Sequence, residues 1–355
     1  MRIGLAGVGR IGAFHASTLA GLDAVDDVIV ADLDSALAER VATEQGLSAA
    51  SDIDTLLASG IDALVIATAT TAHAPLLRQA LAAGIPTFCE KPVAASLDET
   101  IALTELAESS DTPVHIGFQR RFDLGYLRAR DAVAAGDLGT IHAVRALTHD
   151  QEPPHAAYIP TSGGIFRDCS VHDFDIVRFV TGREVDSVYA TGENKGAAFF
   201  AAAGDVDTGA AILTLDDGTL VTATSTRYSG GGHDVRMEVM GSAANLAVGL
   251  DDSLALRSAE EGVAFPAGPP HASFMQRFLA AYRAELTAFC DVAAGRIASP
   301  CTVRDALQAF RTAEACELSR AQRRLVSMRE IPNASAAPAG SSSSSSPTPA
   351  TKATA

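Results

Sequence analysis

Two residues four positions apart, Asp168 and His172, have the chemistry of a proton-transfer site. They enclose the short segment Cys169-Ser170-Val171. If this segment is helical, positions i and i+4 project from the same face, so a carboxylate and an imidazole can act on one bound group. Histidine is the natural proton acceptor near neutral pH. From these residues alone, a helix-capping aspartate beside a satisfied surface histidine is an equally good interpretation.

A second charged pair, Glu90-Lys91, is followed by Pro92 at the end of a short apolar segment that predicts a strand. Ligands of open α/β sheets bind outside the carboxyl ends of the strands, so charges placed there face a bound molecule. Oxidation of an alcohol by hydride transfer needs a base such as His172 and donors that orient the oxygen. The two segments could supply both. The alternative for the first pair is a surface ion pair that closes a turn before a helix.

The chain opens with a nucleotide-binding signature, GVGRIG, between a predicted strand and a predicted helix. Its glycines permit a tight turn, a close approach to a pyrophosphate and close helix packing, and the helix N-terminus attracts anions. Asp32, twenty residues further on, can accept hydrogen bonds from the adenosine ribose and would repel a 2′-phosphate, which favours NAD over NADP. An ordinary strand-helix turn with Asp32 as a helix cap is the alternative. We give His15 no role, and the expected cofactor contacts are Gly7, Gly9, Arg10, Ile11, Gly12 and Asp32.

Up to residue 121, short apolar runs alternate with segments of helical periodicity. The runs span residues 2–6, 25–31, 63–67, 87–89 and 114–117, and the helical segments span 11–22, 36–45, 74–83 and 97–108. Apolar, non-alternating strands separated by helices are typical of a parallel sheet covered on both faces. We therefore expect an α/β fold with a doubly wound Rossmann domain over residues 1–121.

From residue 122 the pattern changes to closely spaced runs with period-2 alternation, which follow a helix at 126–135. The runs span residues 141–148, 184–191, 207–215, 220–228, 235–241 and 245–250. They predict an α+β domain with a large, mostly antiparallel open sheet over residues 122–330. Helical periodicity returns at 274–294 and 303–320, and the later helix can pack back on the first domain. Residues 331–355, rich in Ala, Ser and Pro, predict a disordered tail.

Composition excludes several classes of partner. The formal net charge is −16, and no basic run is strong enough to attract a nucleic-acid backbone. The five cysteines are scattered without a C-x-x-C pair, which argues against a disulfide framework or a thiolate zinc site. No stretch reaches the about 20 apolar residues of a membrane span, and the N-terminus lacks a secretory signal. We expect a soluble, cytoplasmic protein without a bound metal.

Taken together, these motifs resemble those of the Gfo/Idh/MocA oxidoreductases, and most closely the inositol 2-dehydrogenases among them. The resemblance covers nearly the whole chain before the tail. It rests on the glycine signature, on Glu90-Lys91-Pro92 and on residues 117–122, 150–154 and 162–179. It implies that Lys91 donates to the substrate hydroxyl and helps hold the nicotinamide, and that Glu90 contacts the nicotinamide ribose. It also implies that His172 is the general base and that Asp168 binds the substrate and tunes that histidine.

The resemblance implies further contacts on both sides of the site. Thr68 and His73 would line the cofactor, although an asparagine that many relatives have before this histidine is missing. The stretch that contains Arg227-Tyr228 and His233-Asp234 would line the substrate, and its sheet would pack into a dimer or tetramer. The implied substrate-binding residues are Gln119, Arg120, His149, Asp150, Tyr228 and His233.

These expectations lead to one favoured function and two alternatives. The favoured function is NAD-dependent oxidation of a ring secondary alcohol, with myo-inositol or a related inositol as substrate and a keto-inositol as product. Thr148-His149-Asp150 replaces a Ser-Arg-Asp sequence common in inositol enzymes, and an aromatic residue expected near His233 is absent. An NAD(P)-dependent dehydrogenase of a pyranose or anhydrosugar therefore stays open. A non-catalytic dinucleotide sensor is the second alternative, although such a protein would not need Lys91 or His172.

Overall fold

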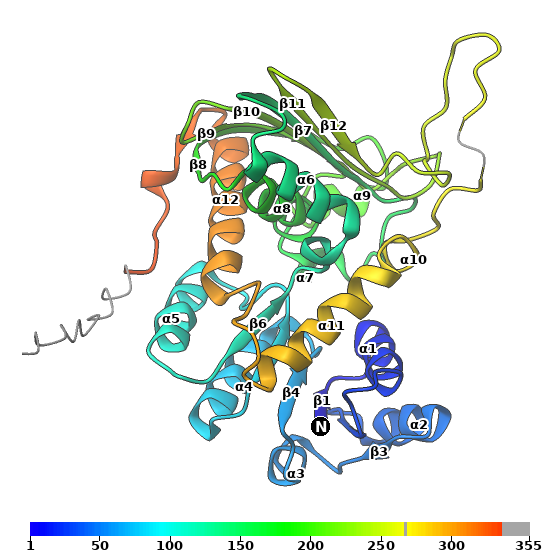
Figure 1. Cartoon of the computed structure of the whole chain (residues 1–355), viewed down its shortest axis with the longest axis vertical. Coiled ribbons are helices and arrows are strands. Elements are labelled where there is room, and N and C mark those ends of the chain that lie inside the picture. Colours follow the sequence, from blue (N-terminus) through cyan, green and yellow to red (C-terminus); the bar gives the residue numbers. More distant parts are fainter. Residues whose placement is uncertain (266–267, 336–355) are drawn as a thin grey trace, which may run out of the picture.

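The protein, described here by a computed structural model over residues 1–265 and 268–335, is built on two β-sheets (Figure 1). The first sheet has six parallel strands in the order β3-β2-β1-β4-β5-β6. These strands are β1 (Arg2–Ala6), β2 (Asp27–Ala31), β3 (Ser48–Ala49), β4 (Ala63–Ile66), β5 (Thr87–Glu90) and β6 (Val114–Gly117). This doubly wound order confirms the predicted Rossmann sheet.

Helices cover both faces of this sheet because its strands are apolar on both sides. Leu64 and Ile66 of β4 join one apolar cluster with Leu77, whereas Val65 joins another with Leu19. The helices that precede or follow these strands are α1 (Arg10–Ala20), α2 (Ser35–Gln45), α3 (Ile53–Ala58), α4 (Thr70–Ala83) and α5 (Leu97–Glu108). The carboxyl ends of the strands are thereby left free for a site.

The second sheet has seven strands in the order β12-β11-β7-β10-β9-β8-β13. All neighbours are antiparallel except β7 and β10, which run parallel. The strands are β7 (Ile141–His149), β8 (Val185–Glu193), β9 (Thr208–Leu215), β10 (Leu220–Thr226), β11 (Asp234–Gly241), β12 (Asn245–Val248) and β13 (Val326–Ser327). The mostly antiparallel second sheet confirms the predicted fold class.

One face of the second sheet is covered by helices and the other is open (Figure 1). Alternation along β9 shows this: Leu213 is buried in the core, whereas the side chain next to it, Ile212, is half exposed. The remaining elements are the 3-10 turn η1 (Gln119–Phe122), α6 (Leu124–Ala135), α7 (Ile159–Ser162), the π-helical turn η2 (Phe166–Ser170), α8 (Val171–Thr181), α9 (Ala198–Ala202), α10 (Phe274–Arg277), α11 (Leu279–Ala293), α12 (Val303–Gln322) and the 3-10 turn η3 (Met328–Glu330). Among the described residues, no helix is both long and apolar enough to cross a membrane.

The structure differs from the expected elements where they are short or interrupted. The strands β3 and β13 and the helices α3, α7 and α9 were not predicted, because two to six residues carry too little periodicity. The expected helix over 274–294 is divided into α10 and α11 at Phe278, whose φ of −110° and ψ of 18° leave the helical region.

The predicted tail begins too early at residue 331. Ile331 and Ala334 are buried, and the Arg311 guanidinium donates to the carbonyls of Ile331 and Pro332 at 2.8 Å each. The two buried apolar side chains and the hydrogen bonds from Arg311 to the two carbonyls therefore hold residues 331–335 against α12. Residues 336–355 of the predicted tail lie outside the described residues. The predicted domain boundary at residue 121 stays a prediction.

A buried ion pair lies where the two sheets meet. Arg121 of η1 donates Nε and Nη2 to the Asp175 carboxylate of α8 at 2.9 and 2.6 Å, and Nη1 to the Pro300 carbonyl at 2.9 Å. Asp305 of α12 also lies 3.2 Å from Nη2. A fully satisfied buried pair of this kind specifies one arrangement of the elements that it joins.

Substitution of Asp175 by Asn should destabilise the protein by about 3 kcal/mol, because it leaves a buried guanidinium without its main carboxylate. The value lies at the low end for a broken buried pair because Asp305 remains near Arg121. The free energy of unfolding in urea measures the effect. Asp217→Asn, which removes the solvent-exposed partner of Arg183, is the control and should cost less than about 1 kcal/mol. Equal losses in both variants would contradict the prediction.

Candidate active site

Strand register brings three separate segments together at one end of the second sheet. His149 of β7 pairs with Thr226 of β10 and with Asp234 of β11. The residues next to these positions, Asp150, Arg227 and His233, therefore meet beyond the strand ends. Opposite them is the end of β5, where the Rossmann sheet presents Glu90 and Lys91.

Lys91 reaches from the Rossmann domain to the second domain. Its Nζ donates to the Asp168 carboxylate at 3.1 Å and to the Asp168 carbonyl at 3.0 Å. Asp168 lies in the π-helical turn η2, a feature common at functional sites. Two further donors hold the same carboxylate: Tyr158 Oη at 2.9 Å on Oδ1 and Arg227 Nη2 at 2.6 Å on Oδ2. The predicted residues Lys91 and Asp168 are thus in direct contact.

The neighbours of Asp168 keep its carboxylate ionised. Burial by itself raises the pKa of this group, but the charges of Lys91 and Arg227 and the hydrogen bonds from Arg227 and Tyr158 outweigh burial. The net result is a pKa well below the ordinary value for aspartate. Asp168 is therefore a hydrogen-bond acceptor at physiological pH and not an acid or a base.

His172 lies in the first turn of α8, with its ring edge-on to Phe118 at 5.6 Å between centroids. Its Nδ1 is buried without a hydrogen-bond partner among the described residues. Burial, followed by the charges of Lys91 and Arg120, lowers the pKa of His172 well below its ordinary value, and the charge of Asp168 opposes this shift. The imidazole is neutral near pH 7, the form that can accept a proton. No hydrogen bond joins Asp168 and His172 in the described part of the chain, so the carboxylate acts on the histidine through its charge.

Two predicted substrate contacts are wrong. Arg120 is buried, and its two terminal nitrogens donate to Asp173 at 2.7 Å and to Thr148 at 2.8 Å. Only its Nε, which is also buried, has no partner among the described residues. Arg120 acts instead by holding the residue after His172. His149 bonds Thr224 on the open face of the sheet, because alternation along β7 points Thr148 and His149 to opposite faces.

The other predicted substrate residues have mixed positions. Asp150 accepts from Arg227 Nη1 at 3.0 Å, and His233 Nδ1 lies 3.4 Å from the other Asp150 oxygen, so both are part of the site. Tyr228 packs on the loop before α9, where its hydroxyl accepts from the Ala197 N–H at 3.0 Å, and it therefore supports that loop. Gln119 is buried in η1, and its substrate contact stays a prediction.

The glycine loop has the shape that a pyrophosphate requires. Gly7 has a φ of +90°, and a Cβ on Gly12 would lie 1.8 Å from the Gly7 carbonyl, so neither position accepts a side chain. A Cβ on Gly9, by contrast, would meet nothing within 4 Å. Gly9 is also the N-cap of α1 and carries no side-chain cap, so the first N–H groups of α1, at Arg10 and Ile11, can serve an anion. The loop therefore fits a dinucleotide.

Asp32 is fixed beside this loop at the end of β2. Its carboxylate accepts from the Val8 N–H at 2.8 Å and from the Asp34 N–H at 3.1 Å. A carboxylate held there is placed for ribose hydroxyls and disfavours a phosphate in the same position. On the other side of the loop, the Arg10 guanidinium lies 5.4 Å from the ring centroid of Phe274 in α10. These residues fit the NAD-binding roles predicted for them.

His15 has a function that the sequence analysis missed. It is fully buried in α1, and its Nε2 lies 2.6 Å from Glu90 Oε1. The helix that would receive the pyrophosphate is thereby joined to the residue predicted to hold the nicotinamide ribose. His73 also differs from expectation: its two ring nitrogens face the carbonyls of Pro92 at 2.7 Å and Thr68 at 3.1 Å. The ring positions these turns and has no free nitrogen for a cofactor, and a cofactor contact through the backbone of this segment stays a prediction.

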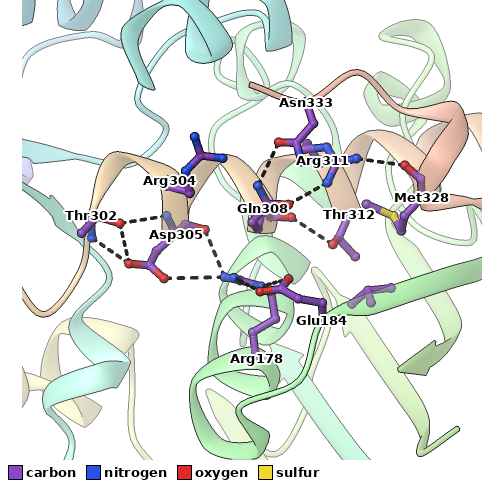
Figure 2. Close-up of a pocket in the computed structure, with 11 residues that line it drawn as sticks. Arg178, Glu184, Thr302, Arg304, Asp305, Gln308, Arg311, Thr312, Met328 and Asn333 are labelled. Carbon is purple, nitrogen blue, oxygen red and sulfur yellow. Dashed lines mark hydrogen bonds and ion pairs between the residues drawn. The ribbon is translucent and has the colours of Figure 1, made fainter. Parts of the chain in front are cut away.

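A cavity of about 530 Å³ lies elsewhere, between α8, α12 and the end of the described chain (Figure 2). Although three arginines line it, they are already engaged. Arg178 pairs with Glu184, Arg304 pairs with Glu108, and Arg311 donates to Gln308 and to backbone carbonyls. The cavity contains none of the residues that surround Lys91. The residues with proton-transfer chemistry around Lys91 therefore lie outside this cavity.

Comparison with known proteins identifies the family of this chain. Residues 1–118 match the oxidoreductase family with an NAD-binding Rossmann fold, and residues 126–247 match the GFO/IDH/MocA C-terminal domain. The myo-inositol dehydrogenase Hyg17 of Streptomyces leeuwenhoekii is 39% identical over 90% of this chain and 97% of its own. The chain belongs to the Gfo/Idh/MocA oxidoreductase family.

Solved structures agree with this membership. A putative myo-inositol dehydrogenase from Sinorhizobium meliloti superposes with a TM-score of 0.84 at 34% identity, over 92% of this chain and 99% of its own. The scyllo-inositol dehydrogenase of Lactobacillus casei, solved with NAD(H) and scyllo-inositol, has a TM-score of 0.83 at 28% identity, over 93% and 99% of the two chains. Like other Gfo/Idh/MocA proteins, this chain is an NAD-linked oxidoreductase, and the predicted family, enzyme class and cofactor are confirmed.

Gly9→Ala should weaken NADH binding by about tenfold or more, because a methyl group would occupy the space left open for the pyrophosphate. The fold should be unaffected, since no atom lies within 4 Å of the new group and φ is −62°. Titration followed by NADH fluorescence measures the affinity, and the melting temperature reports on the fold. Ser59→Ala, in the first domain but away from this loop, is the control. Unchanged NADH affinity in Gly9→Ala would show that the dinucleotide does not approach this loop.

Proposed function

We propose that this protein oxidises a ring secondary alcohol of an inositol to the ketone, with NAD as the hydride acceptor. The observation that carries the proposal is the convergence of Lys91 with Asp168 and its neighbour His172 from two domains. An ammonium held at 3.1 Å from an ionised carboxylate lies beside an imidazole whose lowered pKa keeps it neutral. This is the pair of groups that alcohol oxidation needs.

Each residue has a distinct part in this mechanism. The Lys91 ammonium donates to the oxygen of the reacting hydroxyl and stabilises the negative charge that develops there. His172 accepts the hydroxyl proton on its neutral imidazole, whose Nδ1 has no partner among the described residues. Bound NAD supplies the acceptor for the hydride that leaves the same carbon. Asp168 holds Lys91 in place and has acceptor capacity left for a substrate hydroxyl.

An inositol is favoured as substrate for two reasons. Relatives that this chain matches over most of its length are named myo- and scyllo-inositol dehydrogenases. In addition, Asp150 and Asp168 present acceptor oxygens to the site, while both terminal nitrogens of Arg227 between them already donate to these carboxylates, which suits an uncharged polyol. We assign cofactor binding to residues 1–121 and substrate binding to 122–330.

The open face of the second sheet favours a homo-oligomer. Tyr189 and Ile212 are paired neighbours on β8 and β9, and both are at least 41% exposed. Leu220 and Leu246 are also exposed on this sheet. An apolar sheet face of this kind is typical of an association surface, so we propose that two or four copies pack through it. The five cysteines are free in the structure, which suits a reducing, cytoplasmic location.

Steady-state oxidation of a panel of inositols and aldoses with NAD tests the substrate. We expect NADH formation with inositols, and activity on aldoses alone would favour the pyranose alternative.

Lys91→Ala and His172→Ala should each lower turnover by about 100-fold or more, because each removes a group used in the transition state. Both variants should retain NADH binding. Normal turnover in both variants would contradict the assignment, and a wild type that binds NADH but oxidises nothing in the panel would favour the sensor alternative.

A double substitution on the open sheet face, Tyr189→Lys with Ile212→Lys, should reduce the assembly to a monomer. Paired positive charges on the two facing copies repel and lose the apolar contact. Light scattering coupled to gel filtration measures the mass. Ile297→Lys introduces a charge at an exposed apolar position before α12 and should leave the mass unchanged. A wild-type protein that is already monomeric would contradict the proposed assembly.

A further inference from the structure

Arg227 connects two carboxylates that come from different parts of the second domain. Its Nη1 donates to Asp150 after β7 at 3.0 Å, and its Nη2 donates to Asp168 in η2 at 2.6 Å. The arginine is 3% exposed, so both contacts are shielded from water. A guanidinium is planar and rigid, and the positions of its two terminal nitrogens are fixed relative to each other. The side chain therefore sets the separation and orientation of the two carboxylates.

Both carboxylates retain capacity to accept further hydrogen bonds. Among the described residues, Oδ2 of Asp168 receives only the Arg227 donor, whereas its Oδ1 is shared by Lys91 and Tyr158. Oδ1 of Asp150 faces only His233 within the same part of the chain, at 3.4 Å. A carboxylate oxygen can accept two hydrogen bonds. One acceptor position is therefore left on each of the two carboxylates that Arg227 holds.

The charges around these acceptors are balanced. Lys91 and Arg227 carry two positive charges, and Asp150 and Asp168 carry two negative ones. The Nη1 and Nη2 donors of Arg227 are directed at the two carboxylates, whereas its Nε is buried without a partner among the described residues. An acidic ligand that reached the free oxygens of Asp150 and Asp168 would therefore meet two negative charges. Hydroxyl groups, which donate without charge, complement the pair.

We propose that Arg227 is a positioning residue that sets substrate specificity by holding Asp150 and Asp168 at a spacing that accepts two hydroxyls of one uncharged polyol. The inference rests on the proposed function and deepens it. The substrate class is a neutral ring with at least two further hydroxyls near the one that is oxidised. Arg227 itself touches neither the reacting carbon nor the cofactor, and it acts through the two carboxylates.

A role in positioning can be separated from a role in charge balance. The charged and titratable groups around Asp168 come from several elements. Lys91 follows β5, Arg227 follows β10 and Tyr158 precedes α7. The others are Asp150 after β7, Cys169 on η2 and His172 on α8. Removal of the Arg227 charge raises the pKa of Asp168, because burial then acts against fewer opposing charges. A lysine at position 227 keeps the charge but has a single nitrogen and cannot reproduce the fixed spacing.

The test compares Arg227→Lys and Arg227→Gln with the wild type on myo-inositol. In Arg227→Lys, KM should rise about 10- to 100-fold while kcat falls much less, since hydrogen bonds to the bound polyol are lost. In Arg227→Gln, the acid limb of kcat/KM should in addition move to higher pH, because loss of the guanidinium charge raises the pKa of Asp168. NADH affinity, measured by fluorescence, should be unchanged in both. Arg145→Lys, in an exposed cross-strand pair with Glu238, is the control and should leave all values unchanged.

Several outcomes would overturn the proposal. An unchanged KM in Arg227→Lys would exclude a role in spacing. Equal losses in both variants, with no movement of the acid limb and with a lowered melting temperature, would show that Arg227 only supports the fold. If the wild type oxidises no polyol, the proposed function fails. The positioning role of Arg227 is then tested separately, by comparing crystal structures of Arg227→Lys and the wild type. A changed separation of the Asp150 and Asp168 carboxylates supports the positioning role, and an unchanged separation overturns it.

Discussion

The contact between Lys91 and Asp168 joins the two domains at the site proposed for the chemistry, and much of the arrangement around it follows from what that contact requires. An ammonium can be held in a partly buried crevice only if its partner is ionised. Burial alone would protonate the Asp168 carboxyl, so the carboxylate needs Arg227 and Tyr158 as additional partners. Arg227 in turn needs Asp150 to balance its own charge. A single catalytic lysine thus accounts for a chain of polar residues that extends across the second sheet.

The same surroundings leave Asp168 charged and His172 neutral. Nearby positive charges lower the pKa of both groups, because they stabilise the carboxylate and disfavour the imidazolium. Burial lowers the pKa of His172 further, whereas it raises the pKa of Asp168 and so opposes the charges there. The pKa values of both groups are therefore lowered, which leaves one permanently charged acceptor and one neutral base. Pairs of titratable groups with separate protonation roles are typical of acid-base sites. The absence of a hydrogen bond between these two described side chains is consistent with this division, because a direct bond to the carboxylate would favour the protonated histidine.

Local sequence patterns were sufficient for part of this site and not for the rest. The glycine loop, Lys91, Asp168 and His172 could be found because each lies in a short motif whose spacing reflects a strand end or a helix face. Arg120 was misassigned because its partner, Asp173, lies 53 residues later, and only the packing of η1 on α8 shows that the two neutralise each other. The error at His149 has another cause: residues on a strand alternate between faces, and a shift of one position moves a side chain out of the site.

The contacts that the sequence analysis missed all join residues from distant segments, including those of Arg227, which it had placed only in a substrate-lining stretch. His15 holds Glu90, Tyr158 and Arg227 hold Asp168, and none of these contacts has a spacing that a linear pattern could reveal. Strand order could have indicated Arg227, because it follows β10 directly beside the end of β7, but that requires the register of the parallel pair β7-β10. The fold class, by contrast, follows from the periodicity of long segments and was predicted correctly.

The C-terminal helices explain how contacts between the domains can be precise enough for catalysis. After the second sheet, the chain returns to the Rossmann domain, where Leu286 of α11 packs in the cluster on one face of the first sheet and Ala309 of α12 packs in the cluster on the other (Figure 1). The Ile116 N–H also donates to the Cys301 carbonyl at 2.9 Å, next to the buried Arg121 ion pair. The two domains are therefore held together on both sides of the crevice. Because binding energy is then not needed to assemble Lys91, Asp168 and His172, it remains available to orient the substrate.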